Sequence, residues 1–267
     1  MFNSHVAVTS CYPVEVLLNN HLDKEVQAIF YPFNFLLTIS MSSKYCIRDN
    51  YITPTQRKFH ILRFVCTVAL LVIYDSVTFK VFAGENIIFY IARFLSVIRN
   101  LTFLQNVAVS ILCNQDNVLL VVLIQMIHRS IDLSNKIRSF IAWNWIIIAT
   151  ISAFNIMVAT AFSSGKDGFN FIGCFTDVIY TSFDVDFVYS IRVLNLLNKY
   201  LYEWIKSVRI MNEGKENDKM NCTKLLKTYE NILRAYDVYK KVTQYLVSIL
   251  RKGYIILCFS ITKQKTM

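Results

Sequence analysis

Proline, glycine and charge are all scarce in this chain of 267 residues. The 3 Pro and 6 Gly exclude collagen-like repeats and Pro-rich disorder. Charged residues make up only 17% of the chain, whereas hydrophobic residues make up 55%. A soluble domain is usually about 45–50% apolar with about 25% charge. The composition therefore favours a bundle of membrane helices over a soluble domain.

Clusters of reactive side chains are missing as well. The seven Cys and four His are scattered, and no CxxC occurs, so we expect no metal site, no disulfide framework and no cofactor. Ser, His and acidic residues do not cluster, and no glycine-rich nucleotide fingerprint is present. Asp184 and Asp186 are two residues apart, so on a helix they point about 200° away from each other and form no carboxylate pair. These patterns do not indicate an enzyme.

Long apolar stretches predict four membrane spans. The clearest is 140–162, because no charged residue lies between Ser139 and Gly165 and about 20 apolar residues suffice to cross a bilayer. A weak fifth candidate at 242–261 is interrupted by Arg251 and Lys252. Residues 1–58 are expected to form an N-terminal and interfacial lead-in segment, in which 29–39 is too short to cross. The four expected spans are 59–79, 86–113, 140–162 and 169–197.

Cations are distributed unevenly between the loops that these spans define. With residues 114–139 taken as a loop, 18 Lys and Arg fall on the side of the N-terminus and 2 on the opposite side. The positive-inside rule then places the N-terminus in the cytoplasm. It also accounts for the net charge of +10 without a nucleic-acid partner. We therefore expect an all-α, polytopic plasma-membrane bundle over residues 59–198 that contacts the lipid bilayer.

Residues 199–248 are expected to form cytoplasmic anchor helices. Val193, Leu197, Tyr200, Trp204 and Val208 recur at helical spacing, so the fourth span should continue past the membrane as one helix. The polar stretch 212–223 reads as a loop. A second stripe has the spacing of a packed helix, and it fits either a helix that covers its neighbour or subunit association. This stripe consists of Leu225, Tyr229, Ile232, Tyr236 and Tyr239.

Two segments are similar to a known protein family. The stretch FYPFNFLLTISMSSKYCIRDNYITP (Phe30 to Pro54) resembles the start of moth and butterfly gustatory receptors, and LLKTYENILRAYDVYKKVTQYLVS (Leu225 to Ser248) resembles the helix before their fifth span. The resemblance covers residues 25–248 and rests on diffuse patterns. It implies a seven-span, ligand-gated cation channel for small organic tastants. It also implies a homo- or hetero-tetramer with other receptor subunits that meet through cytoplasmic helices.

The end of the chain departs from that family. The family's last-span signature, Thr-Tyr followed by five apolar residues and Gln-Phe, is absent. After Ser248 the chain continues as ILRKGYIILCFSITKQKTM, so we interpret residues 249–267 as an aberrant or truncated fifth span. On this interpretation the chain alone carries no current. The alternatives are a fragment of a small-solute membrane transporter and a non-conducting structural subunit.

Charged and aromatic residues within the spans are the candidate functional residues. Charges in a bilayer are costly and tend to pair. Matching depths predict a pair between Arg93 and Asp177, with Asp75 as a rival partner for Arg93. They also predict a pair between Arg99 and Asp184. Such pairs either hold the bundle together or line a ligand cavity. Side chains in the outer halves of spans two to four that could complete a tastant pocket with Arg93 and Asp177 are Phe89, Tyr90, Phe94, Phe154, Asn155, Phe171, Phe175, Tyr180 and Phe183.

Overall fold

The computed structural model describes residues 20–81, 87–131, 133–165, 168–169, 171–213 and 222–244, and within several helices it describes only the backbone. The helices are α2 (Lys24–Ile39), α3 (Arg57–Val81), α4 (Ile87–Leu112), α5 (Asn114–Ser130), α6 (Ser134–Ser163), α7 (Phe171–Glu213) and a further helix over 222–244. Two small antiparallel pairs are formed by β1 (Cys46–Arg48) with β2 (Tyr51–Thr53), and by β3 (Ser164–Gly165) with β4 (Gly168–Phe169). The prediction of an all-α fold is confirmed.

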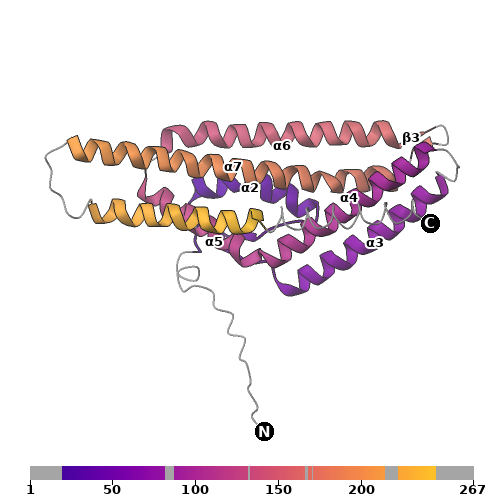
Figure 1. Ribbon diagram of the computed structural model, residues 1–267, viewed down its shortest axis with the longest axis horizontal. Helices are drawn as coiled ribbons and strands as arrows, with labels where there is room; N and C mark the ends of the chain where they lie inside the picture. The colour runs from indigo at the N-terminus through magenta and orange to yellow at the C-terminus, as the bar shows by residue number, and fades with distance from the viewer. Residues whose placement is uncertain are drawn as a thin grey trace, which may run out of the picture.

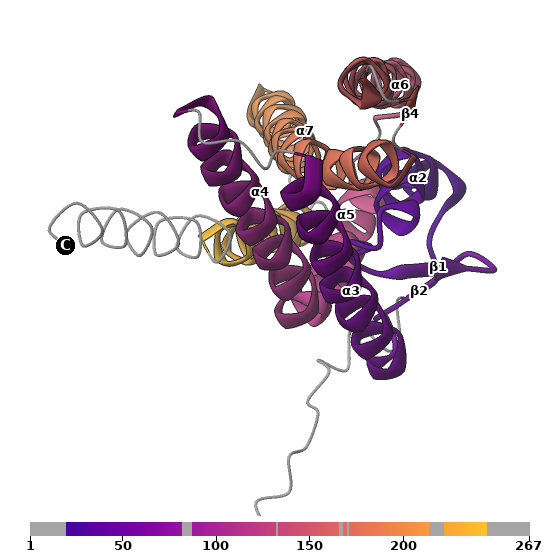
Figure 2. The same ribbon diagram turned by 90° about the vertical axis from the view of Figure 1, so that its right-hand side faces the viewer.

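Helices α6 and α7 lie side by side along the long axis of the molecule (Figure 1). Helix α2 packs against both of them, and α5 contacts α2 and α7. Helices α3 and α4 cross α7 near its N-terminal half, whereas the helix over 222–244 covers its C-terminal half (Figures 1 and 2). The molecule therefore has two ends, which share α6 and α7.

The main hydrophobic core lies where α2, α5, α6, α7 and the helix over 222–244 meet. Helix α5 is its centre, because residues 120–125 and 127 are all buried. The expectation of a loop over 114–139 is therefore wrong for most of that stretch. The apolar run of α5 is too short to cross a bilayer, and the protein covers it instead. A 66° bend separates α5 from the Phe103–Leu112 part of α4.

Asn114 holds the bend between α4 and α5. Its side-chain Oδ1 accepts the Thr55 N–H at 3.1 Å, and its Nδ2 donates to the Thr55 carbonyl at 3.1 Å. The same Nδ2 lies 3.0 Å from Nε2 of His60, in the first turn of α3. One buried amide thus fixes the start of α5 to the start of α3.

Helix α7 is continuous over 43 residues, or about 65 Å at 1.5 Å per residue. The prediction that the fourth span runs on as one helix is confirmed. Trp204, in its C-terminal half, stacks on Tyr229 with 4.7 Å between ring centroids, and its indole N–H donates to the Leu225 carbonyl at 2.9 Å. Ile232 is fully buried in the core. Of the two readings of the second stripe, packing within the chain is the one observed.

The outer surfaces of α3 and α6 are apolar. Lys136–Ala161 is, among the described residues, the one helical segment long and apolar enough to cross a membrane, and the bent pair Phe103–Leu112 and Asn114–Ser130 meets the same test jointly. The four expected spans correspond to α3, α4, α6 and the first part of α7, but a polytopic bundle stays a prediction. The exposed apolar side chains are Phe59, Ile61, Leu62, Phe64, Val65, Val68, Val72 and Ile73 on α3, and Trp143, Trp145, Ile146, Phe154, Ile156 and Met157 on α6.

The buried stripe of the helix over 222–244 predicts a large difference between two neighbouring substitutions. Ile232→Ala should destabilise the protein by about 2–5 kcal/mol, because it leaves a cavity against α7. Leu233→Ala removes a side chain that is 46% exposed and should change stability by less than about 1 kcal/mol. Thermal melting of the two purified variants in detergent measures the difference. Equal melting temperatures would contradict the packing of this helix on α7.

Candidate functional site

A polar loop buried inside the bundle connects α2 to β1. Loops usually lie on the surface, because buried polar backbone groups need partners. This loop begins with a sharp reversal, in which Met41 adopts the left-handed conformation with φ of 57° and the Ser42 N–H donates to the Leu37 carbonyl at 2.7 Å. Its buried members are Ser40, Ser42, Ser43, Lys44 and Tyr45.

Side chains from α3 and α4 supply partners for this buried loop. Arg63 of α3 donates to the Ser43 carbonyl at 2.9 Å and to the Ser43 hydroxyl at 2.8 Å. Asn106 of α4 donates to the Ser42 hydroxyl at 3.3 Å, and Ser110 lies 3.5 Å from the same hydroxyl. The loop therefore connects two helices that otherwise bury few residues against the rest of the protein.

The ion pair between Lys44 and Asp186 lies at the centre of this cluster. Lys44 Nζ is 3.1 Å from Asp186 Oδ1, and the two side chains are 7% and 2% exposed. The same ammonium lies 4.9 Å from the ring centroid of Tyr189, one turn along α7. Two buried charges are tolerated only when they neutralise each other, and removal of one partner from such a pair costs about 3–5 kcal/mol. Lys44, counted above among the loop cations, instead neutralises an acid of α7.

A second polar cluster joins α2 to α5. The Asp23 carboxylate accepts hydrogen bonds from Nε and Nη2 of Arg129, both at 3.0 Å, and the Asp23 N–H donates to Gln125 Oε1 at 3.0 Å. The hydrogen bond from Arg129 lowers the pKa of Asp23 below its usual value. Above that pKa, the ionised carboxylate holds the start of α2 against the end of α5.

Glu25, His128 and Tyr200 form a chain of hydrogen bonds across α2, α5 and α7. Glu25 Oε2 lies 3.0 Å from His128 Nε2, and His128 Nδ1 lies 3.1 Å from the Tyr200 hydroxyl. This order of carboxylate, imidazole and hydroxyl also occurs in catalytic triads. Here, however, Tyr200 is fully buried, and burial raises the pKa of its hydroxyl. The three side chains therefore act as a clamp in the core.

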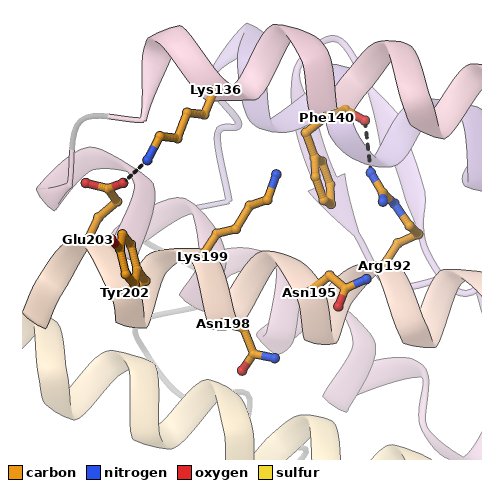
Figure 3. Close-up of a pocket in the computed structure, with 8 residues that line it drawn as sticks. All are labelled: Lys136, Phe140, Arg192, Asn195, Asn198, Lys199, Tyr202 and Glu203. Atoms are coloured by element: carbon orange, nitrogen blue, oxygen red, sulfur yellow. Dashed lines mark hydrogen bonds and ion pairs between the residues drawn. The ribbon is translucent and has the colours of Figure 1, made fainter.

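A pocket of about 390 Å³ lies between the start of α6 and the middle of α7 (Figure 3). The ring of Phe140 lies 3.9 Å from Arg192 Cζ and 4.8 Å from Lys199 Nζ. Arg192 also donates to the Asn144 side chain at 2.7 Å and to the Phe140 carbonyl at 3.2 Å. The lining residues are Lys136, Phe140, Arg192, Asn195, Asn198, Lys199, Tyr202 and Glu203.

Most of the residues that the sequence predicts to line a tastant site fall outside the described side chains. This holds for Asp75, Phe89, Tyr90, Arg93, Phe94, Arg99, Asp177, Tyr180 and Phe183. The pairs of Arg93 with Asp177 and of Arg99 with Asp184 therefore stay predictions.

Among the candidates that are described, Asn155 and Asp184 come together. Asn155 Nδ2 donates to Asp184 Oδ2 at 3.3 Å. Phe154 and Phe175 are more than half exposed. Asp184 is exposed whereas Asp186 is buried, which confirms that the two carboxylates lie on different faces of α7.

The sequence reasoning missed the buried loop and its ion pair. A signal was present, because Asp186 was an acid within an expected span without an assigned partner. Lys44 is the one cation between Glu25 and Ile47 in the segment that leads to the first span. It was assigned to a solvated loop because it lies outside every apolar stretch.

Within the described part of the chain, no three His, Cys, Asp or Glu side chains are placed to hold a metal ion. The chain matches no protein-family model, no curated protein and no solved structure.

The Lys44–Asp186 pair predicts a non-additive pattern of stability. Asp186→Ala or Lys44→Ala alone leaves one buried charge unpaired and should lower the melting temperature by on the order of 10 °C. The double variant Lys44→Met with Asp186→Leu removes both charges and fills the space, so it should melt closer to the original protein. Thermal melting in detergent measures all three.

The control for this series is Asp184→Ala, two residues away and exposed. It should change the melting temperature by no more than about 2 °C. Single variants at Lys44 and Asp186 that behave like this control would show that the buried pair does not stabilise the fold.

Proposed function

We propose that the chain is a multi-pass plasma-membrane protein of the gustatory-receptor type. In this proposal it is a subunit of a ligand-gated cation channel that responds to small organic tastants. Its N-terminus and the helix over 222–244 lie in the cytoplasm. It assembles with other receptor subunits through its cytoplasmic helices.

The single observation that carries the membrane part of this proposal is the distribution of polar and apolar side chains. Apolar residues cover the outside of α3 and α6, whereas an ion pair, an arginine and several amides and hydroxyls lie inside. Soluble proteins bury their apolar residues and seldom bury a charge. A bundle surrounded by lipid shows the pattern observed, because its charges face the interior and pair there. The two-sided distribution of Lys and Arg supports the same placement.

The receptor part of the proposal rests on the resemblance of two segments. Phe30 to Pro54 supplies the second half of α2, the buried loop and the hairpin of β1 and β2. In that hairpin, Asp49 and Asn50 occupy the two positive-φ positions of a tight turn, at 54° and 65°. Leu225 to Ser248 supplies most of the helix that covers α7. Both segments that resemble the receptors thus contribute to the core.

A small-solute transporter is the second candidate, because a buried pair such as Lys44 with Asp186 also suits a solute or proton pathway. A direct measurement of transport distinguishes the two. Uptake of labelled solute by cells that express the chain, without an evoked current, would favour the transporter.

Insertion into a bilayer predicts that the exposed face of α6 is intolerant of charge. Ala153→Asp introduces a carboxylate near the middle of α6, at a cost of about 3 kcal/mol in a bilayer. It should reduce the fraction of protein that stays in membranes after alkaline carbonate extraction by more than half. Ile210→Asp changes an equally exposed position beyond the expected span and should have no effect. Equal extraction of both variants would contradict membrane insertion of α6.

Channel function predicts a tastant-evoked cation current. Cells that express the chain together with a full-length gustatory receptor subunit should show a current that the partner alone lacks, in response to a panel of sugars and bitter alkaloids. The Ala153→Asp variant, if it fails to insert, should abolish the added current. Whole-cell recording measures the response. Currents identical to those of the partner alone, with the chain present at the cell surface, would contradict a role in ligand gating.

A further inference from the structure

The pocket between α6 and α7 carries more positive than negative charge. Lys136, Arg192 and Lys199 line it, and Glu203 is its only acidic residue. Lys136 forms an ion pair with that glutamate (Figure 3). Neither Arg192 nor Lys199 has a carboxylate partner among the residues that the structure describes. Two cations beside one pocket are therefore left without a counter-ion.

These two cations are held close together. Arg192 and Lys199 are two turns apart on the same face of α7, and both contact the ring of Phe140. The hydrogen bonds from Arg192 to Asn144 and to the Phe140 carbonyl fix its guanidinium at the pocket wall. Figure 3 shows the Lys199 side chain directed from α7 towards α6, with no interaction drawn to its ammonium. Burial, followed by the charges of Arg192 and Lys136, lowers the pKa of Lys199. Such crowding is unfavourable until an anion binds.

The position of the pocket along the helices indicates the source of that anion. On α6, the pocket residues Lys136 and Phe140 precede the exposed Trp143, Trp145 and Ile146. Tyr31 of α2 packs on Trp145, with 6.1 Å between ring centroids. On α7, the exposed Phe187 and Ile191 precede the pocket, and Lys199, Glu203 and Lys206 lie on its other side. The pocket thus lies at the boundary between an apolar and a charged zone, next to Trp and Tyr, which are enriched at the level of lipid headgroups.

We propose that this pocket binds a phosphate-bearing anion, presented as the headgroup of an acidic membrane lipid. Arg192 supplies fixed guanidinium N–H donors that are not used within the protein, and Lys199 supplies a mobile ammonium. The volume of about 390 Å³ accommodates a phosphorylated headgroup. Basic pockets between membrane helices on the cytoplasmic side recognise anionic headgroups in this way. The lipid source rests on the membrane placement proposed above, whereas the phosphate chemistry does not.

Binding by the full chain, purified in detergent, tests this site without a bilayer or a current. The probes are a short-chain phosphatidylinositol bisphosphate, soluble inositol trisphosphate and short-chain phosphatidylcholine, titrated by microscale thermophoresis. Lys199→Gln should weaken binding of the bisphosphate lipid about tenfold, which corresponds to about 1.4 kcal/mol. Lys199→Glu should weaken it further. The matched control Lys227→Gln also removes one exposed cation, but from the helix over 222–244, and should leave the affinity within about twofold.

Each outcome bears on the proposal. Tighter binding of the lipid than of inositol trisphosphate supports a headgroup, and equal binding of the two supports a phosphate site filled from solution. Equal loss of affinity in Lys199→Gln and Lys227→Gln, or binding of phosphatidylcholine as tight as that of the bisphosphate lipid, would overturn the site. The extraction and current measurements do not depend on these results, so failure of the site leaves the proposed function standing, and the reverse also holds.

Discussion

The fold depends on the neutralisation of one buried charge by another. The chain leaves α2 through a loop that runs inside the bundle, and that loop brings Lys44 to Asp186 at 3.1 Å. An unpaired charge at such a position is strongly destabilising, so the loop and α7 can only be buried together. The loop in turn supplies acceptors to Arg63 of α3 and Asn106 of α4. The orientation of two helices with small cores of their own is thereby linked to one ion pair.

Helical periodicity was the most informative part of the sequence, and it failed where burial came from tertiary packing. The apolar spacing along α7 predicted a single long helix, and the spacing from Leu225 to Tyr239 predicted a packed helix, because both patterns are local. Helix α5 was missed because its apolar run has the length of neither a membrane span nor an amphipathic surface helix. Lys44 was misplaced because nothing near it in sequence indicates that Asp186, about 140 residues later, lies beside it.

The candidate sites show the same limit. The sequence placed the two carboxylates of residues 184 and 186 on different faces of α7, since that follows from helix geometry alone. It could not reveal the pocket at Phe140, whose cations come from two helices and meet only once α6 and α7 pack together. A charged residue in an apolar stretch identifies a position of interest, but its partner depends on how distant helices pack. The tastant site expected near Phe154 and Phe175 lies towards the other end of α6 and α7 from this pocket.

The continuity of α7 has a mechanical consequence. A helix of 43 residues without an internal proline or break behaves as a stiff rod. Any rotation about its own axis turns Phe175 near one end and Trp204 near the other through the same angle. Trp204 is stacked on Tyr229, so the same rotation also shifts the helix that covers it. The two ends of the protein are therefore coupled by torsion, without any need for a bend or a local loss of helix between them.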